Sequence, residues 1–236
     1  MLQSHWHCLC GLVLLMIMGG TAGMRAADYP PPREGDFTAR DFHFQDGEVL
    51  PELHLHYATL GTPVRDAAGM VTNAVLILHG TGGSWKQFTA PQFAGELFGP
   101  GQPLDVSHFF LVIPDSIGHG GSSKPSDGLR MRFPHYNYDD MVAAQHALLT
   151  QGLGINHLRL VMGTSMGCMH SWVWGETYPN FMDALMPLAC QPVQIAGRNR
   201  CGGKKRWTPS GLIPPGKTAS TRKSQSRACA PRRTSC

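Results

Sequence analysis

Solid apolar runs recur along the middle of the chain and predict strands that are buried on both faces. Three such runs lie at residues 74–78, 108–113 and 158–162, and residues 184–188 are a possible fourth. Residues 138–151 and 168–178 have a helical pattern instead. Because strands alternate with helices, the pattern predicts an α/β fold with a doubly wound, mostly parallel sheet.

The boundaries of the two helices carry their own signals. Asn137 or Asp139 is a suitable N-cap for the first helix, and Pro179 stops the second. One face of the first helix is apolar, made by Met141, Ala144, Leu148 and Leu149. This face is expected to pack on the sheet.

Residues 37–57 alternate polar and apolar side chains, with a turn signal at Asp46-Gly47. A period of two on both sides of a turn is typical of an antiparallel hairpin. We therefore expect a hairpin in front of the parallel sheet.

The positive charge of the chain is confined to its last residues. All 16 acidic residues and 11 of the 20 basic residues lie in residues 1–200, and the other nine basic residues lie in residues 201–236. The basic balance therefore does not indicate that the body binds nucleic acid. Residues 201–236 are rich in Lys, Arg, Ser, Pro and Gly and predict either a disordered tail or an out-of-frame translation product.

The first 27 residues resemble an export signal. An apolar core at residues 11–18 is too short to span a bilayer and is followed by small residues. The segment before it holds histidines but no Lys or Arg, so an unprocessed N-terminus in a cytoplasmic protein is the alternative. We expect a signal peptide at residues 1–27, a catalytic domain at residues 28–200, and a periplasmic or secreted location. No segment predicts a stable membrane span.

The seven cysteines show no metal-binding spacing. Only Cys168 and Cys190 belong to the predicted domain, and both lie in apolar segments. Buried free thiols are the default expectation for them, and a disulfide between them is left open.

Residues 163–167 read Gly-Thr-Ser-Met-Gly, the G-x-S-x-G pattern of a nucleophile elbow. A predicted strand precedes Ser165 and a predicted helix follows it, which is the setting that exposes a serine hydroxyl at the edge of a sheet. The alternative is a Gly/Ser turn that only links strand to helix. We expect Ser165 to be a nucleophile in acyl transfer.

Such a serine needs donors for the oxyanion that forms during the reaction. The backbone N–H of Met166 is one candidate because of its place after the serine. The second candidate is Thr81, in a loop after the first buried strand, where Gly80 and Gly82 allow close approach to a substrate. The loop lacks the sequence patterns of nucleotide sites, so we expect neither a nucleotide, another cofactor nor a metal.

The triad acid and base have no match in this chain. Asp115 follows a buried strand and is expected to be structural, and His119 lies in a glycine-rich loop. After Ser165 come only His170, within the predicted helix, and the acids Glu176 and Asp183. The elbow order requires an acid and then a histidine later in the chain.

Several motifs together resemble the α/β-hydrolase superfamily. They are His79-Gly80-Thr81-Gly82-Gly83, the loop from Asp115 through Gly118-His119-Gly120-Gly121-Ser122, and the Ser165 elbow. The elbow and Tyr57-Ala58-Thr59-Leu60-Gly61 look most like the homoserine O-acetyltransferase-related branch. The resemblance covers residues 37–200, the N-terminal half or so of such a fold.

The resemblance implies an eight-stranded sheet, a cap after the sixth strand, and a Ser-Asp-His triad whose acid and base come late. The fold in this chain is therefore expected to be incomplete at its C-terminal end, with truncation or a frameshift after about Arg200. The hydrolase-like glycine loop and the export signal favour an esterase-like hydrolase that acts on a small ester or thioester through an acyl-serine. A homoserine O-acetyltransferase-like acyltransferase and a non-catalytic remnant are the alternatives, and the oligomeric state is left open.

Overall fold

The computed structural model describes residues 29–193, and the structure below refers to these residues. The expected signal peptide and basic tail lie outside them. Six strands form one sheet in the order β1-β2-β4-β3-β5-β6. The strands are β1 (Arg33–His43), β2 (Val49–Leu60), β3 (Ala74–Leu78), β4 (Phe110–Pro114), β5 (Leu160–Thr164) and β6 (Leu185–Leu188).

The pairing divides the sheet into an antiparallel and a parallel part. β1 pairs with β2, and β2 with β4, in antiparallel fashion. β4, β3, β5 and β6 are parallel to one another. This confirms the predicted hairpin, whose turn closes with a hydrogen bond from the Gly47 N–H to the Phe44 carbonyl at 3.0 Å.

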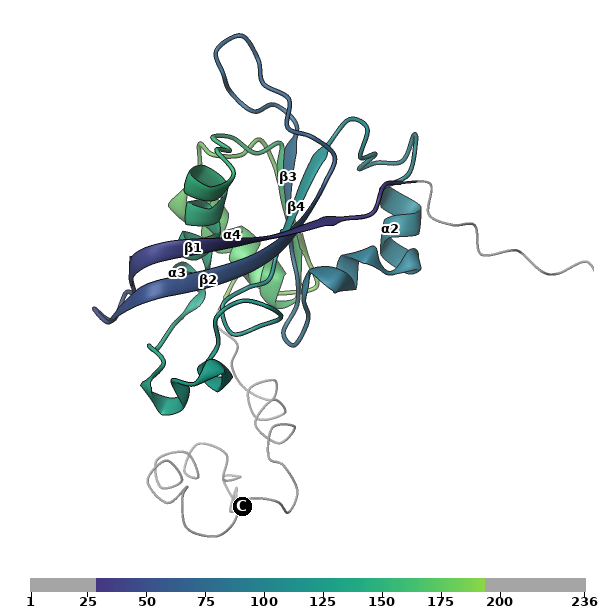
Figure 1. Cartoon of the computed structure of the whole chain (residues 1–236). Helices are drawn as coiled ribbons and strands as arrows, with labels where there is room; N and C mark the ends of the chain where they lie inside the picture. The colour runs from purple at the N-terminus through teal and green to yellow at the C-terminus, as the bar shows by residue number, and fades with distance from the viewer. Residues whose placement is uncertain (1–28, 194–236) are drawn as a thin grey trace, which may run out of the picture. The chain divides into compact units, whose positions relative to one another are not determined.

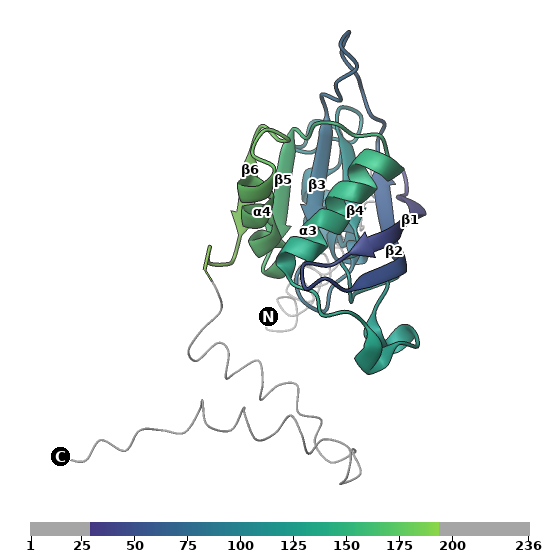
Figure 2. The same ribbon diagram turned by 90° about the vertical axis from the view of Figure 1, so that its left-hand side faces the viewer.

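Helices cover both faces of the parallel strands (Figure 1). α3 (Tyr138–Ala147) and α4 (Met166–Thr177) lie together on one face, as the view in Figure 2 also shows, while α2 (Pro91–Leu97) lies on the opposite side. The sheet is therefore doubly wound and mostly parallel, as expected.

The side chains of β3 show how the two layers of core form. Val75 and Ile77 pack with Trp85 and Phe88, whereas Leu76 and its neighbours on the other face pack with the helix residue Trp174. Every residue of β3 is buried. Complete burial on both faces explains why this strand reads as a continuous apolar run.

Some helix boundaries agree with the predictions and others differ. The Asn137 side chain caps α3 by accepting a hydrogen bond from the Asp140 N–H at 3.0 Å. The helical pattern continues beyond α3 as a wider π turn, Leu148–Gly152, in which the Leu153 N–H bonds to the Leu148 carbonyl. The helix after the elbow begins at Met166, two residues earlier than expected. The short helix α2 and the preceding 3-10 turn, Trp85–Thr89, were not foreseen because each is too short to show a period.

Candidate active site

Ser165 lies between β5 and α4 in a backbone conformation that few serines adopt. Its φ is 54° and its ψ is −110°, which lies in the positive-φ region where an L-residue is strained. Its N–H donates to the Leu188 carbonyl at 3.0 Å, and its carbonyl accepts from the Met169 N–H at 3.2 Å. Among residues 29–193 the hydrogen bonds of Ser165 are these backbone bonds, and the residue is exposed. Its hydroxyl is thus presented at the carboxyl edge of the sheet.

The glycines on either side of the serine are required by close backbone packing. A Cβ at Gly163 would overlap the Gly167 carbonyl, and a Cβ at Gly167 would overlap the Leu78 carbonyl at the end of β3. The elbow is therefore held by contacts that any larger side chain would break, which is how strained conformations persist at functional sites.

The loop after β3 brings its backbone next to the serine. A Cβ on Gly80 would stand 3.3 Å from the Ser165 Cβ and 3.9 Å from its Oγ. Thr81 follows at an exposed position, and Met166 begins α4, where the first N–H groups have no partner within the helix. Among the described residues, no hydrogen bond uses the Thr81 or Met166 N–H. Gly82 continues the loop at φ 76°.

Gln87 connects this loop to the end of β5. Its Oε1 accepts a hydrogen bond from the Gly80 N–H at 3.4 Å, and its Nε2 donates to the Thr164 Oγ1 at 3.2 Å. One side chain thus bridges the glycine-rich loop after β3 and the residue before Ser165. The sequence did not single out Gln87, because nothing in its spacing ties it to Ser165.

His79 ties the loops after β3 and β4 together. Its Nε2 accepts a hydrogen bond from the Ser116 N–H at 3.0 Å, so its Nδ1 carries the proton that is donated to the Gly80 carbonyl at 2.8 Å. The ring is fully buried, and burial lowers its pKa. His79 is therefore a neutral structural residue with both nitrogens occupied.

Asp115 has the structural role that was expected of it. Its two carboxylate oxygens accept hydrogen bonds from the Trp85 N–H at 2.7 Å and from the Gly121 N–H at 2.8 Å. Both oxygens are used to hold loop backbone, and the residue is buried. His119 in the same loop directs its Nδ1 to the Ile117 carbonyl at 3.1 Å.

The remaining candidates for a base or acid, His170 and Glu176, both lie within α4. His170 is buried, its ring packs edge-on against Tyr138, and its Nδ1 lies 3.3 Å from the Gln145 Nε2. Burial is the main cause that lowers its pKa to about 3, so it stays neutral. Glu176 is exposed near the far end of α4.

Asp183 does meet a histidine, but at the wrong edge of the sheet. Its Oδ1 lies 2.9 Å from the His157 Nε2, and its Oδ2 accepts from Arg159 at 2.9 Å. These residues precede β5 and β6, whereas Ser165 follows β5. At about 3.3 Å per residue, the five residues of β5 separate the two sites by about 16 Å. Within residues 29–193, no side chain forms a hydrogen bond with the Ser165 hydroxyl.

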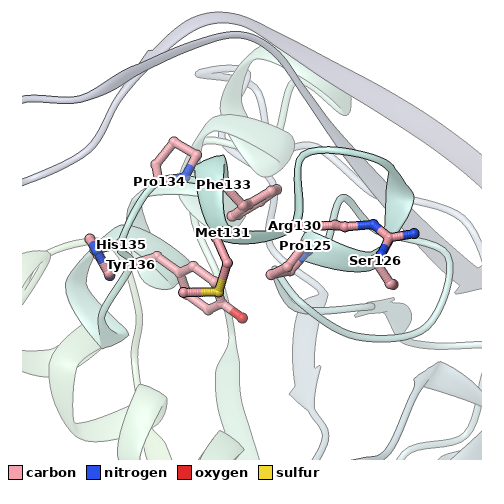
Figure 3. A pocket seen from close by; sticks show the side chains of 8 residues that line it. All are labelled: Pro125, Ser126, Arg130, Met131, Phe133, Pro134, His135 and Tyr136. Atoms are coloured by element: carbon pink, nitrogen blue, oxygen red, sulfur yellow. The ribbon is translucent and has the colours of Figure 1, made fainter. Parts of the chain in front are cut away.

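A hollow of about 600 Å³ opens in the segment that follows β4. Since β4 and β5 are parallel, this segment and Ser165 extend from the same edge of the sheet. Figure 3 shows Met131 over Tyr136, with the Arg130 guanidinium at the other end beside Ser126. The lining residues are Pro125, Ser126, Arg130, Met131, Phe133, Pro134, His135 and Tyr136.

Residues 29–193 show neither a metal-binding cluster nor a membrane-spanning helix. No cluster of three or more His, Cys, Asp or Glu side chains has the arrangement to hold a metal ion. In the same residues no helix combines the length and apolar character needed to cross a membrane.

The sheet order, the elbow and the glycine loop agree with a known family. The sequence model described as "alpha/beta hydrolase fold" matches residues 73–192. The chain belongs to the α/β-hydrolase fold family. The match runs from the start of β3 past the end of β6 and so includes the whole parallel part of the sheet.

Curated relatives of this α/β-hydrolase-fold chain include acyltransferases. A probable acyltransferase of Methanothermobacter thermautotrophicus is 35% identical over 164 residues, which is 69% of this chain and 50% of that protein. A homoserine O-acetyltransferase of Moorella thermoacetica is 35% identical over 173 residues, 65% of this chain and 45% of that protein. The chain spans about half the length of these relatives.

Solved structures of similar fold include an esterase. An acetylester hydrolase from Corynebacterium glutamicum superposes with a TM-score of 0.57 at 28% identity, over 66% of this chain and 43% of that chain. The family of this chain thus contains both ester hydrolases and acyltransferases.

The cysteines correct one expectation. Cys168 and Cys190 form a disulfide, with their Cα atoms 5.9 Å apart, so the default of free thiols was wrong. The two residues are separated by 22 positions in sequence and are brought together by the pairing of β6 with β5. Sequence spacing alone does not reveal that proximity.

Proposed function

We propose that Ser165 is the nucleophile of an acyl-transfer reaction, in which an ester is hydrolysed through an acyl-serine intermediate. The observation that carries the proposal is the strained, exposed elbow with the backbone of Gly80 beside it. Strain of this kind persists only where the surrounding structure enforces it, and a mere connecting turn does not require it. Acyltransferase and esterase relatives support the same chemistry.

In the proposed reaction the Ser165 Oγ attacks the carbonyl carbon of a small ester or thioester. The N–H groups of Thr81 and Met166 would stabilise the negative oxygen of the tetrahedral intermediate. Collapse of that intermediate expels an alcohol or thiol and leaves the acyl group on Ser165. Attack by water then releases the carboxylic acid and restores the serine.

The hydroxyl also needs a base to accept its proton, and within residues 29–193 no side chain forms a hydrogen bond with it. Loss of a triad member in well-studied serine proteases lowers the rate by about 10⁴ to 10⁶. We therefore propose that turnover by this chain is slow unless the acid and base, which come late in the family, are supplied.

Hydrolysis of p-nitrophenyl acetate by the purified chain tests this proposal, with the Ser165→Ala variant as its control. The account requires that any ester cleavage above the uncatalysed rate disappears in Ser165→Ala. Activity that survives this substitution unchanged would assign the reaction to another group and remove the nucleophilic role.

Transfer to an alcohol is a second candidate, favoured by the 35% identity to a homoserine O-acetyltransferase. It differs from hydrolysis only in what accepts the acyl group. Incubating acetylated protein with homoserine or water, and identifying the product by mass spectrometry, separates the two. If neither an acetyl ester nor an acetyl thioester acetylates Ser165, the third candidate, a non-catalytic remnant, is favoured.

We also propose that the protein is exported. The apolar N-terminal segment is one reason, and the Cys168–Cys190 disulfide is a second, because disulfides persist mainly in oxidising compartments. N-terminal sequencing of the mature protein from its host tests this: a start within or soon after residues 19–28 is expected, and a start at Met1 would contradict it.

A further inference from the structure

The disulfide lies next to the nucleophile elbow. Cys168 is the third residue after Ser165 and is buried within the first turn of α4. Cys190 is the second residue after the end of β6 and is half-buried. The bond therefore fastens the carboxyl end of β6 to the helix that begins at the serine.

The same two segments are also joined by a hydrogen bond. Thr164 and Leu188 are register partners, and the Ser165 N–H donates to the Leu188 carbonyl at 3.0 Å. The disulfide thus closes a short ring that runs from Ser165 to Cys168, across the sulfurs to Cys190, and back through Leu188. Ala189, between the last two, has a positive φ of 61°. Because the disulfide is the covalent link on the other side of this ring, it limits how far Leu188 can move from the Ser165 N–H.

β6 is short and only partly buried, although its Leu188 side chain packs against the core cluster that contains Val75 and Ile77. The strand has only four residues, and among the described strands it pairs with β5 alone. Its residues are half-buried or exposed, with Met186 46% exposed. Short edge strands with few buried contacts open locally at a low free-energy cost. The Leu188 carbonyl is therefore expected to depend on the disulfide for its position.

We infer that Cys168 and Cys190 are positioning residues, whose disulfide keeps the Leu188 carbonyl on the Ser165 N–H and so maintains the elbow. Reduction by a dithiol such as dithiothreitol transfers two electrons and two protons, giving two cysteine thiols and the oxidised, cyclic reductant. The opened ring frees β6 to move away from Ser165. Any effect of reduction on the acylation of Ser165 rests on the proposed function. The effect of reduction on the Ser165–Leu188 hydrogen bond does not.

Amide hydrogen exchange of the complete chain, resolved to single residues, tests the inference. After reduction we expect the Ser165 N–H to exchange about tenfold faster, because its bond to Leu188 opens more often. The matched internal control is the Val161 N–H, which donates to the Ala184 carbonyl at the other end of the β5–β6 pair. Its exchange is expected to change by less than about threefold, because it lies outside the ring.

A cysteine variant and reoxidation distinguish the loss of this disulfide from a general increase in hydrogen exchange. Cys190→Ser should show fast Ser165 exchange with or without reductant, and reoxidation of the natural chain should restore protection. The chain has seven cysteines, so the bond is first located by digestion with a protease that cleaves after Glu176, between the two cysteines. Free thiols at Cys168 and Cys190 in the oxidised protein would overturn the inference.

Equal exchange at Ser165 before and after reduction would also overturn it. Labelling of Ser165 by a fluorophosphonate probe is measured separately on the oxidised and reduced forms. Faster exchange without any Ser165 labelling would contradict the proposed function and leave the positioning role intact. Labelling at the same rate in both forms, with unchanged exchange, would support the nucleophile and overturn the role of the disulfide.

Discussion

The Asp183 Oδ1 lies 2.9 Å from the His157 Nε2, the contact expected of a catalytic acid and histidine, yet the pair sits at the amino end of β5 and β6. Ser165 is at the opposite end of β5, whose three central residues are buried. Hydrogen bonds from Arg159 and then His157 lower the pKa of Asp183. The pair therefore links the starts of two strands and takes no part in the proposed chemistry.

Asp183→Asn should consequently leave the reactivity of Ser165 unchanged within about twofold, since an exposed ion pair contributes only about 0–1 kcal/mol to stability. Fluorophosphonate labelling of Ser165 in this variant and in the natural chain measures the difference. A large loss of labelling without loss of folding would show that Asp183 acts on the nucleophile.

Gln87→Ala should lower the labelling rate of Ser165 by about tenfold, because the glycine-rich loop after β3 loses its bridge to Thr164 and about 1.4 kcal/mol corresponds to that factor. The adjacent Lys86→Ala is the control, since Lys86 contacts the ring of Trp85 and not the loop. Thermal unfolding of both variants should stay close to that of the natural chain. Equal labelling of the two variants would rule out a positioning role for Gln87.

Gly167→Ala should destabilise the protein by about 1–3 kcal/mol, because the added methyl group overlaps the Leu78 carbonyl. The control is Gly95→Ala in α2, where the added methyl meets no atom within 4 Å and should be neutral or stabilising by up to about 1 kcal/mol. Urea unfolding of the two variants gives the comparison. Similar midpoints would contradict the close packing of α4 on β3.

His170 makes the stability of the fold depend on pH. Burial lowers its pKa to about 3 in the folded protein, while an unfolded histidine titrates near pH 6.5. Below about pH 6.5 the unfolded state therefore binds the extra proton, and stability falls by about 1.4 kcal/mol per pH unit until the folded pKa is reached. Burial also lowers the pKa of His79 and His146, so these residues add to the loss of stability as the pH falls.

Urea unfolding at pH 7 and pH 5 measures this dependence. The natural chain should lose about 2 kcal/mol through His170 alone, and His170→Gln should lose less because glutamine does not titrate. Parallel pH profiles for the two proteins would show that His170 is already protonated or solvated in the fold.

The sequence predicted what depends on local pattern. The apolar run of β3 indicates burial on both faces, and the glycines around Ser165 indicate close packing. Both features can be predicted because each leaves its mark on residues that are adjacent in the sequence. Gln87 and the Cys168–Cys190 bond were not predictable in this way. Each depends on segments that meet only when the sheet forms, so nothing in their sequence spacing signals the contact.

Two polar pairs were also not predicted, because their residues meet only when the sheet forms. His79 and Ser116 are brought together by adjacent parallel strands, and Asp183 meets a histidine that precedes it in the chain. The family order requires a histidine after the serine, and His157 precedes it, so the sequence pattern does not indicate the contact with Asp183. Its position at the amino edge explains why it does not fill the triad.

The most direct test of the central claim is a peptide map of the chain after prolonged treatment with a fluorophosphonate probe. We expect the probe on Ser165 with an occupancy at least about tenfold above that of Ser126, an exposed serine outside the elbow, because the proposed oxyanion N–H groups of Thr81 and Met166 would stabilise the reaction at Ser165 alone. Substitution of Ser165 by alanine should remove that label. Equal occupancy at Ser165 and Ser126, in a chain shown to be folded, would contradict the account.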